Sequence, residues 1–403
     1  MSPAPPSRAS LRGLDWFIFC VADVQTGFGP FVSVYLTAQK WTQTDIGLIL
    51  SLHGLAALLL QVPGGALIDA LGKERLLAAL AMIAIAASAL SFGLWPVFPV
   101  VLLANIVHAG ASCVLGPAIV AISLGLVGYA AIGERLGRNA RFASIGNGFA
   151  AAAMGTFGYF YSSRAVFFVT AALLAPTLFA LTKIDGKEII SRAPSTPSVP
   201  TPSAPEQHKS ERRSRRGYSA LLIFALCTAL FQFANAAMLP LVGSMVTMRS
   251  SDWATALIAA CIVVPQLVVA VFSPLVGRQA ARWGRRPLLL LGYGALVIRG
   301  ALFTSVANPF LLVAVQVLDG ISAAVLGVLV PLIITDVTRE TGRLNLTQGA
   351  IGTAVGIGAS LSTPFAGYLT DRFGSFMAFA GMAASAALGF LLVALLMPET
   401  RPK

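Results

Sequence analysis

Three ionisable side chains lie in stretches of sequence that are otherwise apolar: Asp23, His108 and Asp319. A charge inside a bilayer is costly, about 2.5–3.5 kcal/mol on insertion scales, so each of them is a functional candidate. A carboxylate removed from water titrates closer to neutral pH than a solvated one. That behaviour is what a proton-coupling site requires. We predict that these three residues carry protons, with Asp23 as the leading candidate.

Polar and thiol side chains share helical faces with these groups or lie on equivalent segments. Asn105, His108 and Ser112 are spaced to line one face of a helix, and Gln316 and Asp319 line a similar one. Cysteine can bind soft, thiophilic species, although small apolar packing is its commoner role. The predicted substrate cavity comprises Cys20, Asn105, Ser112, Cys227, Gln232, Asn235 and Gln316.

The composition shows where such residues must lie. Of the 403 residues, 57% are hydrophobic and 11% are charged, and the mean hydropathy is +0.81. Soluble domains average about 45–50% apolar and 25% charged residues, so an ordinary soluble enzyme is excluded. No metal site, nucleotide loop or cofactor motif is found, and we predict neither a metal nor a cofactor. The chain is predicted to be an all-α, polytopic membrane protein.

Twelve apolar runs are long enough to span a bilayer, which needs about 20 residues. They are predicted near 14–37, 46–70, 75–94, 98–125, 141–161, 164–182, 218–246, 253–277, 287–306, 309–335, 345–370 and 375–397. The only long polar stretch, 183–217, is rich in Pro, Ser and charge, and is predicted to be a disordered cytoplasmic linker. The domains are therefore a tail at 1–13, six-helix bundles at 14–182 and 218–397, and a tail at 398–403.

The lysines and arginines are sorted by topology. With the N-terminus inside, 23 of the 28 fall in the tails and the inner loops, four fall in the outer loops, and Arg299 lies within a span. The positive-inside rule therefore predicts that both termini are cytoplasmic. The net charge of +12 is explained by topology, so nucleic acid is not expected as a partner. Arg299 lies near the outer end of its span, where its side chain is expected to snorkel, and its role stays open, as does that of His53.

The two halves resemble each other in three places. Residues 29–33 are similar to residues 239–243, residues 65–73 to residues 277–285, and residues 108–116 to residues 319–327. The offsets of 210, 212 and 211 are nearly constant, which indicates a duplicated six-helix unit. Parallel repeats of this kind are typical of transporters that bind their substrate between the halves.

The segment Gly65-Ala-Leu-Ile-Asp69-Ala-Leu-Gly72-Lys73-Glu74-Arg75 resembles the G-x-L-x-D-R-x-G-R-K loop motif of the major facilitator superfamily. A second copy keeps Gly277, Arg282, Gly284 and Arg285 but has Ala281 in place of the aspartate. The resemblance covers essentially the whole chain and implies two six-helix pseudo-symmetric bundles. It also implies that the loop latches the two halves in the outward-open state. Asp69 can meet the positive N-terminus of another helix. The predicted gating residues are Gly65, Asp69, Gly72, Lys73, Arg75, Gly277, Arg282, Gly284 and Arg285.

The resemblance implies a secondary transporter that works by alternating access. We expect a monomer in the cytoplasmic (inner) membrane that takes a small-molecule substrate together with protons. Proton-coupled efflux of a small toxic or amphiphilic compound is the first hypothesis. The alternatives are an importer or metabolite exporter on the same scaffold, and efflux of a thiophilic metalloid such as arsenite. The sequence has no polar catalytic loop, which argues against a membrane enzyme. It has no structured signalling domain, which argues against a receptor.

Overall fold

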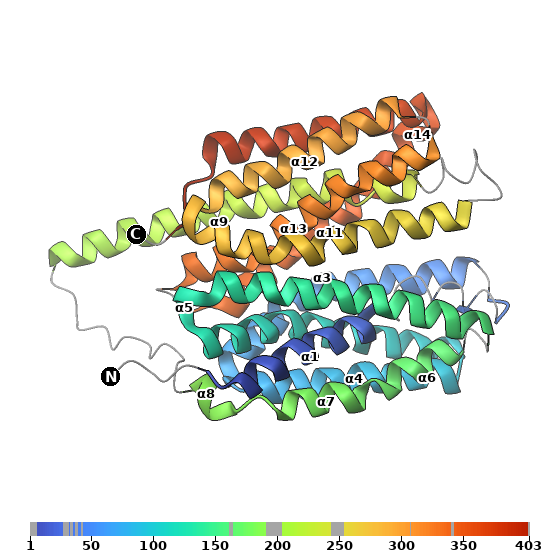
Figure 1. Ribbon diagram of the computed structural model, residues 1–403, viewed down its shortest axis with the longest axis horizontal. Coiled ribbons are helices and arrows are strands. Elements are labelled where there is room, and N and C mark those ends of the chain that lie inside the picture. The colour runs from blue at the N-terminus through green and yellow to red at the C-terminus, as the bar shows by residue number, and fades with distance from the viewer. Residues whose placement is uncertain are drawn as a thin grey trace. The chain divides into compact units, whose positions relative to one another are not determined.

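The structure, a computed structural model, describes residues 6–26, 32, 35–36, 39–41, 43–160, 164–190, 204–242, 254–306, 308–339 and 342–401. All regular elements within these ranges are helices (Figure 1). The helices are α1 (Arg8–Thr26), α3 (Gln43–Leu71), α4 (Glu74–Leu94), α5 (Phe98–Phe160), α6 (Ala165–Ala172), α7 (Leu174–Thr182), α8 (Gly186–Ile190), α9 (Ala204–Asn235), α11 (Ala254–Trp283), α12 (Arg285–Ser305), α13 (Pro309–Thr338) and α14 (Leu344–Leu396).

The chain divides into two compact units. Unit 1 comprises residues 1–193 and 343–349, and unit 2 comprises residues 194–342 and 350–403. Helix α14 therefore begins in unit 1 and continues in unit 2.

Nine helical segments in the described part of the chain are long and apolar enough to cross a membrane. Two of them, in α5 and α14, each join two helices across a residue with non-helical backbone angles, Gly128 and Gly374. Eleven of the twelve predicted spans thus correspond to these segments, and the remaining one is matched by α1 as far as Thr26. The first predicted span, 14–37, reaches into residues outside the described part.

Two helices extend beyond the predicted spans. Helix α1 begins at Arg8, inside the predicted tail, because the Ser7 hydroxyl accepts a hydrogen bond from the Ser10 amide at 3.1 Å and caps the helix. The linker predicted to be disordered contains α8 and the start of α9. After Pro205, which suits a helix start, the sequence holds Glu, Gln, Lys and Arg and no further proline, and these residues favour a helix.

The loop motif and its second copy share one backbone feature. Gly72 separates α3 from α4 with φ +56°, and Gly284 separates α11 from α12 with φ +89°. Left-handed angles of this kind favour glycine, because a Cβ would clash with the backbone. The two glycines are 212 residues apart, as the sequence repeat predicts.

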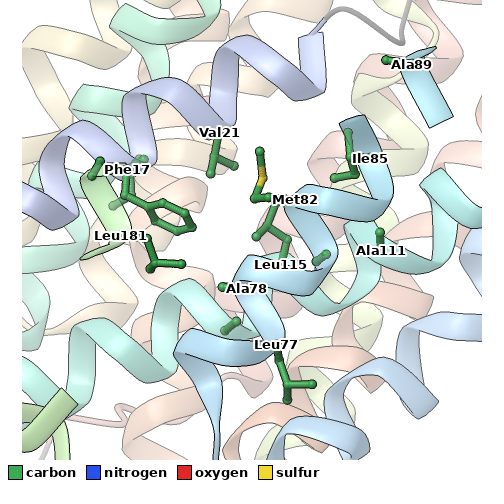
Figure 2. Packing of buried hydrophobic residues seen from close by; sticks show 14 of the residues in the cluster. Phe17, Val21, Leu77, Ala78, Met82, Ile85, Ala89, Ala111, Leu115 and Leu181 are labelled. Carbon is green, nitrogen blue, oxygen red and sulfur yellow. The ribbon is translucent and has the colours of Figure 1, made fainter. Parts of the chain in front are cut away.

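The core of unit 1 lies among α1, α4, α5 and α7. Figure 2 shows Phe17 of α1 facing Leu181 of α7, with Met82 of α4 between α1 and α5. These side chains are at most 5% exposed. Burying a large apolar side chain contributes about 1.5–3 kcal/mol when its reference state is water.

Unit 2 packs α11 and α12 against α13 (Figure 1). Gly292 lets α12 approach α13 closely, since a Cβ there would lie 2.9 Å from the Val325 side chain. At the same place the Ser322 hydroxyl donates to the Gly292 carbonyl at 2.9 Å. Small residues and interhelical hydrogen bonds of this kind hold helices together where lipid offers no hydrophobic driving force.

Within unit 1, α3 also packs tightly against the first turn of α14. A Cβ built on Gly65 would lie 2.0 Å from the carbonyl oxygen of Asn345, and one built on Gly349 would lie 2.3 Å from that of Gln61. Both contacts are with backbone, which cannot turn aside as a side chain can. The α3–α14 junction therefore depends on glycine on both sides.

We predict that Gly65→Ala destabilises the protein by about 1–3 kcal/mol, the usual effect of overpacking. Gly54→Ala in the same helix is the matched control, because no atom lies within 4 Å of its added Cβ. Thermal unfolding of the purified variants in detergent measures the difference. The close packing is disproved if Gly65→Ala unfolds at the same temperature as Gly54→Ala.

Candidate functional site

A buried charge centre joins three helices of unit 2. The Nη1 of Arg299 on α12 lies 2.5 Å from Oδ1 of Asp319 on α13, and it donates to Oδ1 of Asn235 on α9 at 2.6 Å. The guanidinium carbon lies 5.4 Å from the centre of the Phe303 ring. One cation therefore holds together side chains from three helices.

The snorkelling expected for Arg299 is not observed, because its side chain is 1% exposed. Moving an isolated cation out of water is unfavourable by several kcal/mol, so a buried arginine needs a counter-charge and hydrogen bonds. Asp319 supplies the charge and Asn235 supplies a second acceptor. The nearby carboxylate thus explains why α12 carries an arginine within an apolar span.

The charge centre has polar neighbours whose hydrogen-bonding capacity is not fully used. Gln316 lies one turn before Asp319 and is 1% exposed. Neither of its amide atoms has an oxygen or nitrogen partner among the described residues, and the Cys261 thiol of α11 is its polar neighbour. The Nε of Arg299 also lacks a partner in the described part of the chain. Such groups are expected to pair with water or a ligand, because a buried unpaired polar group costs about 1–3 kcal/mol.

A second polar cluster lies at the equivalent place in unit 1. The rings of His53 on α3 and His108 on α5 stack with centroids 5.5 Å apart, and Nδ1 of His53 lies 3.1 Å from the Asn105 carbonyl oxygen. The Asn105 side chain is buried and its Nδ2 has no partner among the described residues. The Cys113 thiol donates to the Ala57 carbonyl at 3.4 Å, so α3 and α5 are joined twice.

These two clusters occupy matching positions of the sequence repeat. Asn105 and His108 correspond to Gln316 and Asp319 at an offset of 211. Each pair is packed against the second helix of its own half: His53 comes from α3 and Cys261 comes from α11. The charge, however, differs, since only unit 2 adds an arginine.

Asp69 of the loop motif binds the start of α14. Its carboxylate accepts hydrogen bonds from Nδ2 of Asn345 at 2.7 Å, from the Leu346 amide at 2.8 Å and from the Asn345 amide at 3.3 Å. An anion at a helix N-terminus is stabilised by the helix dipole and by the free amides of the first turn. All of these residues belong to unit 1.

The other residues of the loop motif make separate contacts. The Arg75 guanidinium donates to the Leu181 carbonyl at 3.3 Å, and Lys73 is exposed in the Gly72 turn. In the second copy, the Arg285 guanidinium pairs with Asp336 at 2.7 Å and its amide donates to Glu399 at 2.8 Å. Further residues of this copy are buried Gly277, Gly284 in its left-handed turn, and Arg282, whose carbonyl accepts from Arg401 at 3.0 Å.

Several predicted residues are not brought into either cluster. Gln232 is half-buried on α9, Cys20 and Cys227 are buried, and the carbonyl of Cys227 accepts the Tyr293 hydroxyl hydrogen. Ser112 is half-buried on α5, and its hydroxyl has no partner among the described residues. The side chain of Asp23 lies outside the described residues. Among the side chains that the structure describes, no group of three or more His, Cys, Asp or Glu is placed to hold a metal.

Unit 1 also contains a charged network that is not among the predicted site residues. Asp15 on α1, 2% exposed, pairs with Arg135 at 2.6 Å and with Arg138 at 2.5 Å, both on α5. Asn139 extends the network by accepting from Arg135 at 2.6 Å and donating to the Ser123 hydroxyl at 2.8 Å. The signal in the sequence is one acid near the start of the first predicted span and two arginines, three residues apart, in a predicted inner loop. The predicted topology places all three on the same side.

Apolar helices with buried polar centres define a multi-pass membrane protein, and comparison with known proteins identifies its family. The profile of the Major Facilitator Superfamily matches residues 15–264 and 224–403. Uncharacterized MFS-type transporters from two strains of Mycobacterium tuberculosis, CDC 1551 / Oshkosh and ATCC 25618 / H37Rv, are each 38% identical over 398 residues, covering 98% of this chain and 95% of theirs. The chain belongs to the major facilitator superfamily, and it is a multi-pass membrane transporter.

Solved structures agree on the fold. The MFS proton:xylose symporter XylE superposes with a TM-score of 0.71 at 14% identity, covering 98% of this chain and 95% of that one. The human organic anion transporter MFSD10 (TETRAN) superposes with a TM-score of 0.68 at 14% identity, covering 97% and 100%. At this identity the similarity shows the architecture alone.

We predict that Asp319→Leu lowers the free energy of unfolding by about 3–5 kcal/mol, because it leaves the buried charge of Arg299 without its partner. Arg299→Met should lower it by less, because the Asp319 side chain that it leaves unpaired is 22% exposed. The double variant should recover most of that loss, since it removes both charges together. Unfolding by denaturant in detergent measures the three values. Arg372→Met, at an exposed position of α14, is the control and should change little. Additive losses in the double variant would show that the pair is not coupled.

Proposed function

We propose that this protein is a proton-coupled secondary transporter that exports a small toxic or amphiphilic compound across the cytoplasmic (inner) membrane. The observation that carries the proposal is the pair of buried Arg299 and partly exposed Asp319 in spanning helices, beside polar groups without partners among the described residues. An ion pair that only stabilises the fold can be surrounded by groups whose hydrogen bonds are all made. A site that exchanges a proton for a ligand, in contrast, needs donors and acceptors that are left for the ligand.

The chemistry of the pair supports coupling. A proton on Asp319 neutralises the carboxylate and breaks its ion pair with Arg299. The guanidinium is then left without its counter-charge, which is unfavourable in a medium of low dielectric constant. A substrate group that can accept a hydrogen bond relieves this imbalance. Proton binding and substrate binding are thereby linked through one side chain.

The polar set also supports a small, mixed substrate. Asn235, Gln316 and Cys261 surround one cation with neutral groups, which do not select a highly charged metabolite. The fold itself accommodates different substrates, because its structural neighbours are a proton:xylose symporter and an organic anion transporter. Import or metabolite export on this scaffold is the second candidate.

A screen identifies the substrate first. A knockout and an overexpressing strain are grown with toxic compounds and metalloids, with and without a protonophore. A compound whose resistance depends on both the gene and the proton gradient is then used in proteoliposomes. A profile in which the gene supports growth on a nutrient would instead identify an importer.

We predict that Asp319→Asn abolishes concentrative transport driven by an imposed pH gradient but retains downhill exchange. Asparagine keeps the shape and an acceptor for Arg299, but it does not titrate. Transport in proteoliposomes with and without the gradient gives both values, and Asp371→Asn, an exposed carboxylate of α14, is the control. Uphill transport at the normal rate by Asp319→Asn would exclude Asp319 as the coupling group. Asp23→Asn and His108→Gln then test the other two candidates.

The Asp69 contact supports a gating role for the loop motif. The carboxylate binds the first turn of α14, and the rest of that helix belongs to unit 2. A bond at the start of a helix that continues in the other unit is suited to hold one state of the transport cycle.

We predict that Asp69→Asn slows transport while substrate binding is retained. Loss of the charge weakens the interaction with the helix N-terminus by about 0.3–1 kcal/mol. Asn345→Ala removes the strongest side-chain partner and should give the same phenotype, with no further loss in the double variant. Transport rates and binding to the solubilised protein are compared at equal expression. Equal loss of binding and transport contradicts a gating role.

A further inference from the structure

Unit 1 contains a pocket that the transport chemistry does not use. It has a volume of about 450 Å³ and lies between the start of α1 and the part of α5 that follows Val127. Leu11, Val127 and Ala131 give it apolar walls, and arginines from both helices surround them. The Lys and Arg distribution assigns this end of the unit to the cytoplasm.

The pocket has an excess of positive charge. Four arginines line it, against one acidic side chain in the lining, Glu134. Asp15 compensates a second charge by pairing with Arg135 and Arg138, so the net charge is +2. The two arginines contributed by α1, Arg8 and Arg12, are exposed and have no ion-pair partner in the described part of the chain. These two cations are available to an anion.

An aromatic track continues from the pocket along the same two helices. On α1, Arg8, Arg12, Trp16 and Phe19 recur at helical spacing on one face. The rings of Trp16 and Phe19 lie 5.5 Å apart, and Phe19 lies 5.8 Å from Phe149 of α5. Trp16 is 57% exposed and Phe149 is 58% exposed.

The arginines of α5 start a matching track. Arg138 lies over the Phe142 ring at 5.5 Å, and Ile145 and Phe149 follow on the same face. Gly146 keeps the two helices close at this level, since a Cβ there would lie 2.5 Å from the Phe19 carbonyl oxygen. Helices α1 and α5 pack against each other. They therefore form one seam with cations at its end and exposed aromatic rings along it.

A ligand that fits this seam carries an anionic head and an apolar tail. From Arg12 to Phe19 the helix rises about 10 Å, which is within the reach of an acyl chain. A soluble anion would use the arginines and leave the rings uncovered. Basic pockets between helices on the cytoplasmic side are suited to anionic lipid head groups, and tryptophan is common at that membrane interface.

We propose that the pocket binds one anionic phospholipid of the cytoplasmic leaflet. The phosphate group pairs with Arg8 and Arg12, and one acyl chain follows the Trp16–Phe19–Phe149 track. The inference does not rest on the proposed transport function, because it concerns only residues of α1 and α5.

Native mass spectrometry of the full-length, delipidated protein tests this site. Phosphatidylglycerol and phosphatidylcholine with the same acyl chains are titrated in turn, together with glycerol phosphate and inorganic phosphate. We expect one tightly bound phosphatidylglycerol. Arg8→Gln and Arg12→Gln should each weaken it about fivefold, the effect of one arginine at a membrane surface. Trp16→Ala should weaken phosphatidylglycerol and leave glycerol phosphate unchanged.

Arg372→Gln serves as the control, because this exposed arginine is in unit 2 and is predicted to lie on the opposite side of the membrane. An equal loss in Arg372→Gln overturns the site, since it shows that only net charge matters. Equal binding of phosphatidylcholine overturns the anionic head group. Equal affinity for glycerol phosphate or inorganic phosphate overturns the acyl track.

Discussion

The hydrocarbon core of a membrane offers polar groups no partner, and this constraint governs the molecule at every level. Backbone amides must be satisfied within each segment, so the spans are helices. Hydroxyls inside those helices return to the carbonyl four residues earlier, as Ser273 does to Val269 at 2.6 Å and Thr170 to Val166 at 2.9 Å. Longer polar side chains form hydrogen bonds and ion pairs with side chains of other helices. The buried clusters are consequences of this same rule.

The sequence predicted the segmentation, the duplication and the loop motif, because each leaves a local trace. Apolar length marks a span, and the left-handed turns at Gly72 and Gly284 recur at the repeat offset. Partners of buried charges leave no such trace. The distance of Arg299 from the end of its span predicts a snorkelling side chain, but its environment is set by Asn235 and Asp319 on other helices. Those partners are determined by how the helices pack, and the hydropathy of a single helix does not predict that packing.

The same reasoning explains the missed network around Asp15. Its two arginines lie 120 and 123 residues away on α5, and each of these charges, taken alone, is typical of a solvated loop end. Only the packing of α1 against α5 makes Asp15 a buried counter-ion. The helices within the predicted linker have a local origin instead. Composition favoured disorder over the whole segment, whereas the local run after Pro205 has good helix formers and α9 starts there.

Both units carry polar side chains at the same position of the sequence repeat. The side chains of the neighbouring helices determine which interactions that position makes. In unit 1 that position holds Asn105 and His108, and the neighbour is the ring of His53. In unit 2 it holds Gln316 and Asp319, and Arg299 adds a permanent charge. The same position of the repeat thus holds an ion pair in unit 2 and a stack of two histidine rings in unit 1. The difference between the two halves therefore comes from the side chains of neighbouring helices and not from the repeated positions alone.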